Sequence, residues 1–132
     1  NMLLDALDEA STVVVVVSQD VSALRSAARM VRTLSDRYGS ARVQLLVNRF
    51  DSRSDLGRDE IERAVGLPVA HEMPSDPRGA LEALNLGSPL VTGDDQGLAR
   101  AIRALADGLT GSVSTKREAP QGMFGRLAWR RA

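Results

Sequence analysis

The chain has no cysteine, few aromatic residues and no long apolar run. Without cysteine it has no disulfide bond, no thiolate nucleophile and no cysteine-ligated metal, which agrees with a reducing compartment. No apolar run reaches about 18 residues, so no segment has the sequence of a membrane-spanning helix. Aromatic residues make up only 3% of the chain, so its core must be built from Val, Leu, Ile and Ala.

Motifs for phosphoryl transfer and nucleophilic catalysis are also absent. The sequence contains no G-x-x-x-x-G-K-[ST] loop, which holds nucleotide phosphates through backbone amides and a lysine, no G-x-G-x-x-G and no G-x-S-x-G. No metal-ligand constellation is present, and the single histidine, His71, is better interpreted as structural. The single lysine, Lys116, follows the last predicted helix, which argues against a receiver domain with a lysine at a strand end. The chain by itself therefore lacks the parts for hydrolysing a nucleotide.

The charges are balanced in number but not in position. Residues 112–132 hold five of the 17 basic residues and one of the 17 acidic ones, so this segment carries a net +4 and the remainder a net −4. A basic segment on an acidic body suggests an acidic partner for that segment. The 132 residues are long enough for one domain with a sizeable core.

Strand and helix signals alternate along the chain. Five consecutive valines at 13–17 predict a strand with both faces buried, which is typical of a parallel sheet covered by helices. The expected elements are a helix at 3–9, strands at 13–17, 43–47 and 67–70, helices at 22–38 and 58–65, a helix after Asp76 that ends near 85–87, an extended piece at 89–91, and a last helix capped by Asp94 or Asp95. Ser22 and Asp76 are the expected N-caps, with Pro77 at the first helical position. This order predicts an α/β fold with a partial doubly wound parallel sheet, a linker at 111–121 and a flexible tail at 122–132.

Two polar loops follow predicted strands. In an open parallel sheet, ligands bind outside the carboxyl ends of the strands. Asn48 follows the second strand, and its amide can donate to and accept from the edge of a purine base, although asparagine also commonly ends a strand in a turn. Pro74, Ser75 and Asp76 follow the third strand, where they can either hold a ring or simply start a helix. The residues alone leave both alternatives open for each loop.

The last eleven residues have the pattern of a basic amphipathic helix. Apolar side chains would share one face and arginines another, with Trp129 at the boundary, as in helices that lie in a membrane interface. Because Gly122 and Gly125 weaken a helix, a disordered basic end is the alternative. The candidate membrane-contacting residues are Met123, Phe124, Arg126, Leu127, Trp129, Arg130 and Arg131. Nucleic acid is an unlikely partner, because the body is acidic and no stacking platform is visible.

Several passages together resemble MinD/ParA-type P-loop ATPases of the SIMIBI class. The passages are VVVVVSQDVSALRSAARMVRTL, VQLLVNRFD and IERAVGLPVAHEMPSDPRGALEALNLGSPLV, and they cover about residues 2–110. One departure is the turn Ser18-Gln19-Asp20, where the family commonly has a Thr/Pro/Glu-like turn. Within the family, the phrases LRSAARMVRTLSDRY, VNRFDSRSDLGRDEIERAVG and PSDPRGALEALNLGSPLV are most similar to the CpaE/TadZ group of Flp/Tad pilus-assembly proteins. MinD-like and FlhG-like subgroups remain alternatives.

The resemblance implies that residues 1–110 are the C-terminal half of an ATPase domain. It implies that Asn48 hydrogen-bonds the adenine of ATP, that Arg49 flanks the base, and that Pro74, Ser75 and Asp76 pass beside it. The phosphates and Mg²⁺ would be held by the other half, and the whole protein would form an ATP-dependent homodimer. It would work with pilus or secretion proteins in the cytoplasm, peripherally at the inner face of the membrane or at the pole. A non-catalytic scaffold derived from such an ATPase is the alternative.

Overall fold

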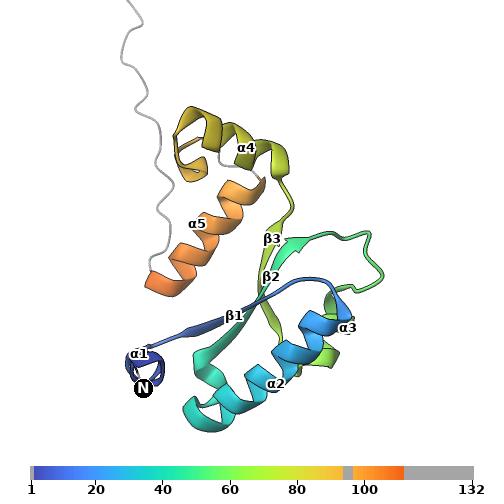
Figure 1. Ribbon diagram of the computed structural model, residues 1–132, viewed down its shortest axis with the longest axis vertical. Coiled ribbons are helices and arrows are strands. Elements are labelled where there is room, and N and C mark those ends of the chain that lie inside the picture. Colours follow the sequence, from blue (N-terminus) through green and yellow to red (C-terminus); the bar gives the residue numbers. More distant parts are fainter. Residues whose placement is uncertain (1, 94–96, 112–132) are drawn as a thin grey trace, which may run out of the picture.

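A computed structural model of the chain describes residues 2–93 and 97–111 (Figure 1). Strands and helices alternate, as the sequence predicts. The elements are α1 (Met2–Glu9), β1 (Val13–Val17), α2 (Val21–Tyr38), η1 (Ser40–Arg42), β2 (Val43–Phe50), α3 (Arg58–Val65), β3 (Val69–Pro74), α4 (Pro77–Leu86), η2 (Leu90–Thr92) and α5 (Gly97–Thr110). In this part of the chain no helix is long and apolar enough to cross a membrane. The predicted linker beyond Gly111, the tail, and the expected caps Asp94 and Asp95 lie outside the described residues.

The three strands form one parallel sheet in the order β1-β2-β3. Val13 pairs with Val43 at one end, and Phe50 pairs with Pro74 at the other. Because each pair of strands is joined through a helix, all three strands point the same way and their carboxyl ends meet at one edge. The predicted α/β class and parallel sheet are therefore confirmed.

The main core lies between the sheet and the pair α2 and α3. Every second residue of β2 points to these helices, and Leu45, Val47 and Ile61 have less than 2% of their surface exposed. Burying each of these side chains stabilises the fold by about 1.5–3 kcal/mol. On α2, Leu24, Ala27 and Val31 form the predicted buried face at spacings of three and four residues.

A bulge in β3 turns its later residues toward the opposite face of the sheet. Leu45 pairs with Val69, but Leu46 pairs with His71, so Ala70 is an extra residue. His71 and Met73 consequently share the face of Leu46, and α5 packs against β3 on that side. Met73 and Ala99 of α5 are buried there, outside the main core cluster.

The opposite face of β1 is only partly covered within the described residues, with Val14 half-buried and Val16 exposed. Val15 and Val17 point to the main core, whereas Val16 is 59% exposed. The expectation that both faces of the valine run are buried is therefore wrong for the described part of the chain. The reason is positional, because β1 is an edge strand there and α5 covers β3.

Four elements also differ from the sequence prediction. The N-cap of α2 is Asp20, whose carboxylate accepts from the Ala23 amide at 2.8 Å, and Ser22 instead donates to that carboxylate. β2 continues to Phe50 because Phe50 pairs with Pro74, and β3 spans Val69–Pro74 rather than 67–70 for the same reason. The segment at 90–92 forms a 3-10 helix, in which the Thr92 amide donates to the Pro89 carbonyl at 3.0 Å.

Candidate functional site

The carboxyl end of β2 is irregular where the sequence places its first candidate residues. Val47 pairs with Glu72 and Phe50 with Pro74, so three steps along β2 match two along β3. Arg49 adopts φ +52°, the one positive φ of a non-glycine residue in the described chain. Such a bulge returns Phe50 to the helix-covered core and leaves Asn48 and Arg49 exposed at the edge. Backbone strain of this kind costs about 1–3 kcal/mol and is concentrated at functional sites.

One of the two polar atoms of the Asn48 side chain already has a hydrogen-bond partner in the neighbouring backbone. Its Oδ1 accepts a hydrogen bond from the Arg49 amide at 3.0 Å, whereas its Nδ2 has no hydrogen-bond partner within the described residues. The free amide group therefore has donors to offer a ligand at the tip of β2.

The second candidate segment begins directly beside this tip. Pro74 ends β3 opposite Phe50, Ser75 is exposed, and Asp76 is the predicted N-cap of α4. The Asp76 Oδ1 accepts from the Gly79 amide at 2.9 Å, which confirms the predicted capping role. Its carboxylate lies so close over Gly79 that a Cβ there would stand 2.3 Å from Oδ2. Asp76 is thus fixed by α4, and Ser75 is the freer side chain of the pair.

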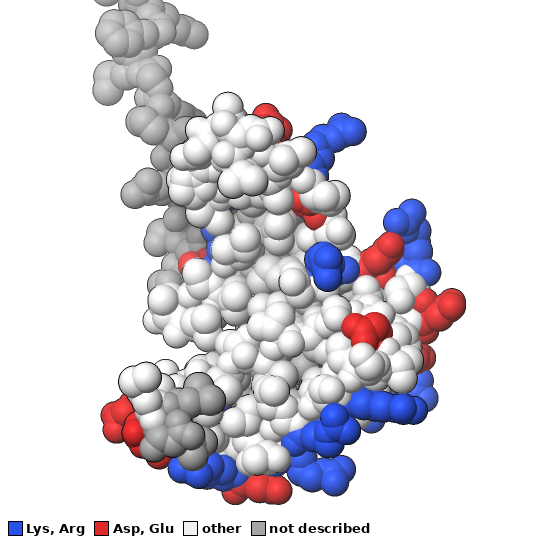
Figure 2. Space-filling model, in the orientation of Figure 1, with Lys and Arg blue, Asp and Glu red and all other residues white. Residues whose placement is uncertain are grey.

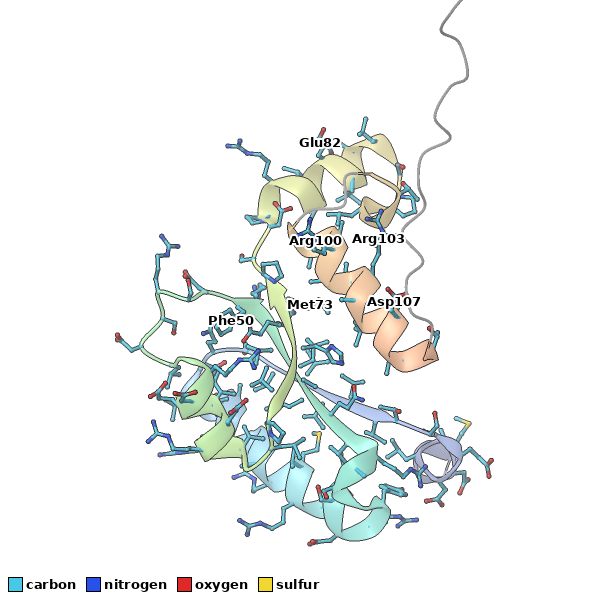
Figure 3. All side chains as sticks on the ribbon, turned by 180° about the vertical axis from the view of Figure 1, so that it is seen from behind. Phe50, Met73, Glu82, Arg100, Arg103 and Asp107 are labelled. Atoms are coloured by element: carbon cyan, nitrogen blue, oxygen red, sulfur yellow. The ribbon has the colours of Figure 1, made fainter. Side chains whose placement is uncertain are left out.

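The structure therefore brings the two predicted loops to neighbouring strand tips at one edge of the sheet. Figure 3 shows Phe50 and Met73 marking the adjacent ends of β2 and β3. Asn48, Arg49 and Ser75 are exposed, so two polar tips lie side by side at this edge.

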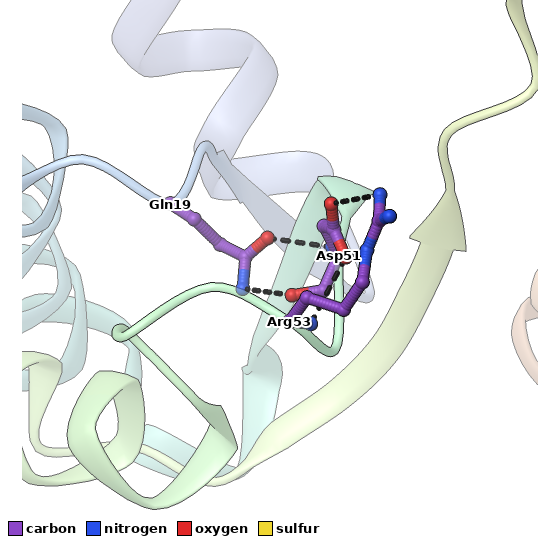
Figure 4. A network of polar contacts seen from close by, with 3 residues as sticks. All are labelled: Gln19, Asp51 and Arg53. Carbon is purple, nitrogen blue, oxygen red and sulfur yellow. Dashed lines mark hydrogen bonds and ion pairs between the residues drawn. The ribbon is translucent and has the colours of Figure 1, made fainter.

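A glutamine that the sequence interpretation assigned no role ties down the loop behind the β2 tip (Figure 4). Gln19 follows β1, and its Oε1 accepts from the Asp51 amide at 2.7 Å. Its Nε2 donates to the carbonyls of Asp51 at 3.1 Å and Leu56 at 2.8 Å. These partners lie 32 and 37 residues away in sequence, so no local signal could have revealed them.

The same loop carries the largest electrostatic perturbation near the site. The Arg53 guanidinium hydrogen-bonds the Asp51 carboxylate through Nε at 3.0 Å and Nη2 at 2.9 Å, and the Arg53 amide also donates to it. These donors stabilise the carboxylate form and lower the pKa of Asp51 to about 2. Asp51 is therefore charged at neutral pH and turned toward its own loop.

A separate cavity lies elsewhere in the described chain. A cavity of about 610 Å³ opens between α4, η2 and the start of α5, lined among others by Glu82, Leu86, Pro89 and Ala99. It touches the candidate site only at Asp76. Outside it, α4 exposes Leu81 and Leu84, and Figure 2 shows that this end carries few charges, which gather instead over α2 and α3.

His71 has a structural environment, as the sequence analysis preferred. Its Nε2 lies 2.9 Å from the Gln44 Oε1, and its Cε1 faces Gly108 of α5. No group of three or more His, Asp or Glu side chains that could hold a metal ion occurs among the described residues.

The chain is similar in structure to a ParA family ATPase from Chlorobium tepidum TLS, with a TM-score of 0.66 and 24% sequence identity over 76% of this chain and 42% of that one. The ParA-like fold that the resemblance implied is thereby confirmed.

The chain is also similar in sequence to an uncharacterized ATP-binding protein of Methanocaldococcus jannaschii. The two are 30% identical over 92% of this chain and 50% of that protein. The chain thus spans about half the length of the curated relative it matches. No protein-family model matches the chain. Membership of the CpaE/TadZ group stays a prediction.

Proposed function

We propose that this chain supplies the adenine side of the ATP site in a MinD/ParA-like ATPase. The observation that carries the proposal is the pairing of Phe50 with Pro74, which sets the two polar tips side by side. In the bound state Asn48 donates from its unpartnered Nδ2 to a ring nitrogen of adenine. Arg49 flanks the base, and Pro74 and Ser75 border the ring with backbone and proline surface. The two ATP-related proteins of similar fold and sequence support this assignment.

The phosphates and Mg²⁺ are held by residues that this chain does not supply. Its sequence has no Walker-type loop, and its described residues contain no carboxylate or histidine cluster for a metal. Asp76, which the resemblance also placed at the nucleotide, contributes by fixing the start of α4 beside the base. ATP hydrolysis and ATP-dependent dimerisation are then properties of the whole protein.

The cellular role follows from the sequence resemblance to the CpaE/TadZ group. The whole protein positions a Tad/Flp-type pilus-assembly or related machine at the membrane or the pole, with pilus or secretion proteins as partners. The competing role is a non-catalytic scaffold or localisation module that descends from such an ATPase. ATP-dependent dimerisation of the full-length protein separates the two.

The test uses adenosine, because the chain has a base slot but no phosphate cradle. Titration of the ¹⁵N-labelled chain with adenosine should shift the resonances of the β2 tip and of residues 74–76, and guanosine should bind more weakly. Asn48→Ala should raise the dissociation constant about fivefold, since one net hydrogen bond is worth about 1 kcal/mol. Ser52→Ala, an exposed change in the next loop, is the matched control. Equal affinity of the Asn48→Ala and parent chains removes the base-binding role.

Membrane contact is assigned to residues 122–132, which lie outside the described residues. Each arginine of this segment contributes about 1 kcal/mol near an anionic surface, so one tail binds weakly and two tails on a dimer bind far better. The full chain should float with vesicles that contain phosphatidylglycerol and not with pure phosphatidylcholine vesicles. A chain that ends at residue 121 should stay at the bottom of the gradient. Equal flotation of the two chains would remove the membrane role.

A further inference from the structure

We propose that Gln19 positions the base-contacting tip of β2, and this proposal rests on the proposed function. Its carboxamide is the one side chain of another element that hydrogen-bonds the loop from Asp51 to Gly57 in the described part of the chain. The remaining bonds of that loop are local, such as the Ser54 amide to the Asp51 carbonyl at 3.1 Å and the Leu56 amide to the Ser54 hydroxyl at 3.2 Å. Gln19 therefore fixes the loop to the neighbouring strand β1.

The anchored point lies immediately behind the candidate site. Gln19 binds both the amide and the carbonyl of Asp51, three residues after Asn48. Between them stands Arg49 with its positive φ, a conformation that persists only where the surrounding structure determines it. The strand pairs of Val47 and of Phe50 flank this bulge, and directly behind Phe50 the side chain of Gln19 holds Asp51. Strand pairing and the bonds from Gln19 thus act together on the direction in which Asn48 presents its amide.

Only an amide side chain satisfies this arrangement. Gln19 accepts from the Asp51 amide with its oxygen and donates to the Asp51 carbonyl with its NH₂ group (Figure 4). The same NH₂ group also donates to the Leu56 carbonyl. A glutamate of the same shape keeps the acceptor but turns a carboxylate oxygen toward the carbonyls of Asp51 and Leu56. Gln19→Glu therefore releases the loop with almost no change of volume. The neighbours Ser18 and Asp20 cannot replace it, because Asp20 caps α2 and Ser18 donates to Asp20.

The experiment compares Gln19→Glu with Arg53→Ala in the full chain. Arg53→Ala is the matched control, because it removes the exposed ion pair of the same loop and leaves the three bonds of Gln19 intact. In the control, the dissociation constant for adenosine should stay within twofold of the parent. In Gln19→Glu it should rise up to about fivefold, as in Asn48→Ala, and the preference for adenosine over guanosine should fall toward one.

That preference separates positioning from a general loss of structure. If Gln19→Glu merely lowered the folded fraction, the apparent affinities for both nucleosides would fall by the same factor and their ratio would stay constant. A retained preference, or an equal effect of Arg53→Ala, would overturn the proposal. Amide exchange gives a readout that needs no nucleoside: Gln19→Glu should lose protection at Asp51 and shift the resonances of Asn48 and Arg49.

The two proposals fail in different ways. A parent chain without adenosine binding contradicts the proposed function, and the exchange measurement still tests the role of Gln19. Unchanged Asn48 and Arg49 resonances in Gln19→Glu would overturn the positioning role even if the parent chain binds adenosine.

Discussion

Asp51 is the residue whose ionisation responds most directly to the geometry of the site loop. Its pKa is about 2 instead of 3.8 because Arg53 donates to it from both side chain and backbone. A folded-state pKa below the unfolded value stabilises the fold at pH values above about 4, and this contribution disappears as the pH falls toward 2. We expect Arg53→Ala to raise the pKa of Asp51, but not fully to 3.8, because the amide of residue 53 still donates.

The measurement is a carboxyl-carbon NMR titration of Asp51 in the two chains. Arg58→Ala is a suitable control, because Arg58 pairs with Glu72 at 2.8 Å and does not contact Asp51. An Asp51 pKa that stays near 2 in Arg53→Ala would show that the guanidinium is not its cause.

Individual residues differ in how well their roles can be predicted from sequence. The capping role of Asp76 is local, since a proline follows it and its acceptor bond reaches only three residues ahead. Asn48 is recognisable as a polar residue after a buried strand. Gln19 is not recognisable, because its partners come from a loop that only the folded sheet brings to it.

Two glycines in the helices of the C-terminal part should respond in opposite ways to alanine. Gly108 lies inside α5, and a Cβ there would meet His71 at an ordinary contact distance of 3.6 Å. Gly108→Ala should therefore raise the free energy of unfolding by about 0.5–1 kcal/mol, through helix propensity and the unfolded state. Gly79 lies in the first turn of α4, where a Cβ would clash with the Asp76 carboxylate at 2.3 Å.

Gly79→Ala should therefore displace the cap and lower the free energy of unfolding by about 1 kcal/mol, in spite of the better helix propensity of alanine. Urea melts followed by circular dichroism measure both variants against the parent chain. A stabilising effect at both positions would mean that the Asp76 cap contributes nothing to the stability of α4.

The helices and strands could be predicted from sequence wherever apolar residues recur at regular spacing, but the residues at which these elements end could not. The buried face of α2 and the helix α3 follow from spacing alone. The polar residues Asn48 and Arg49 looked like the start of a loop, but β2 continues because Phe50 finds a partner in Pro74. The bulge at Ala70 is likewise invisible in sequence, although it decides that His71 and Met73 face α5. Pairing between strands thus sets the geometry of the site more than local propensity does.

At the scale of the whole molecule, the described sheet ends in an unprotected strand. The five valines of β1 form an edge in this part of the chain, with one row of backbone donors and acceptors unpaired by the described strands. Val16 adds an apolar side chain that is 59% exposed on the partly covered face. Long apolar edges of this kind template association with other chains, so the isolated chain should self-associate as its concentration rises.

Val16→Lys should suppress this association, because a charged side chain on an edge strand blocks pairing and Val16 contributes little to the core. Val21→Lys is the matched control: it introduces the same charge at a residue of equal character, 55% exposed, but at the start of α2 and away from the sheet. Sedimentation velocity over a hundredfold range of concentration should show the parent and Val21→Lys chains growing in mean mass while Val16→Lys stays monomeric. Equal suppression by both lysines would assign the effect to net charge, and a parent chain that stays monomeric throughout would show that the β1 edge is already protected.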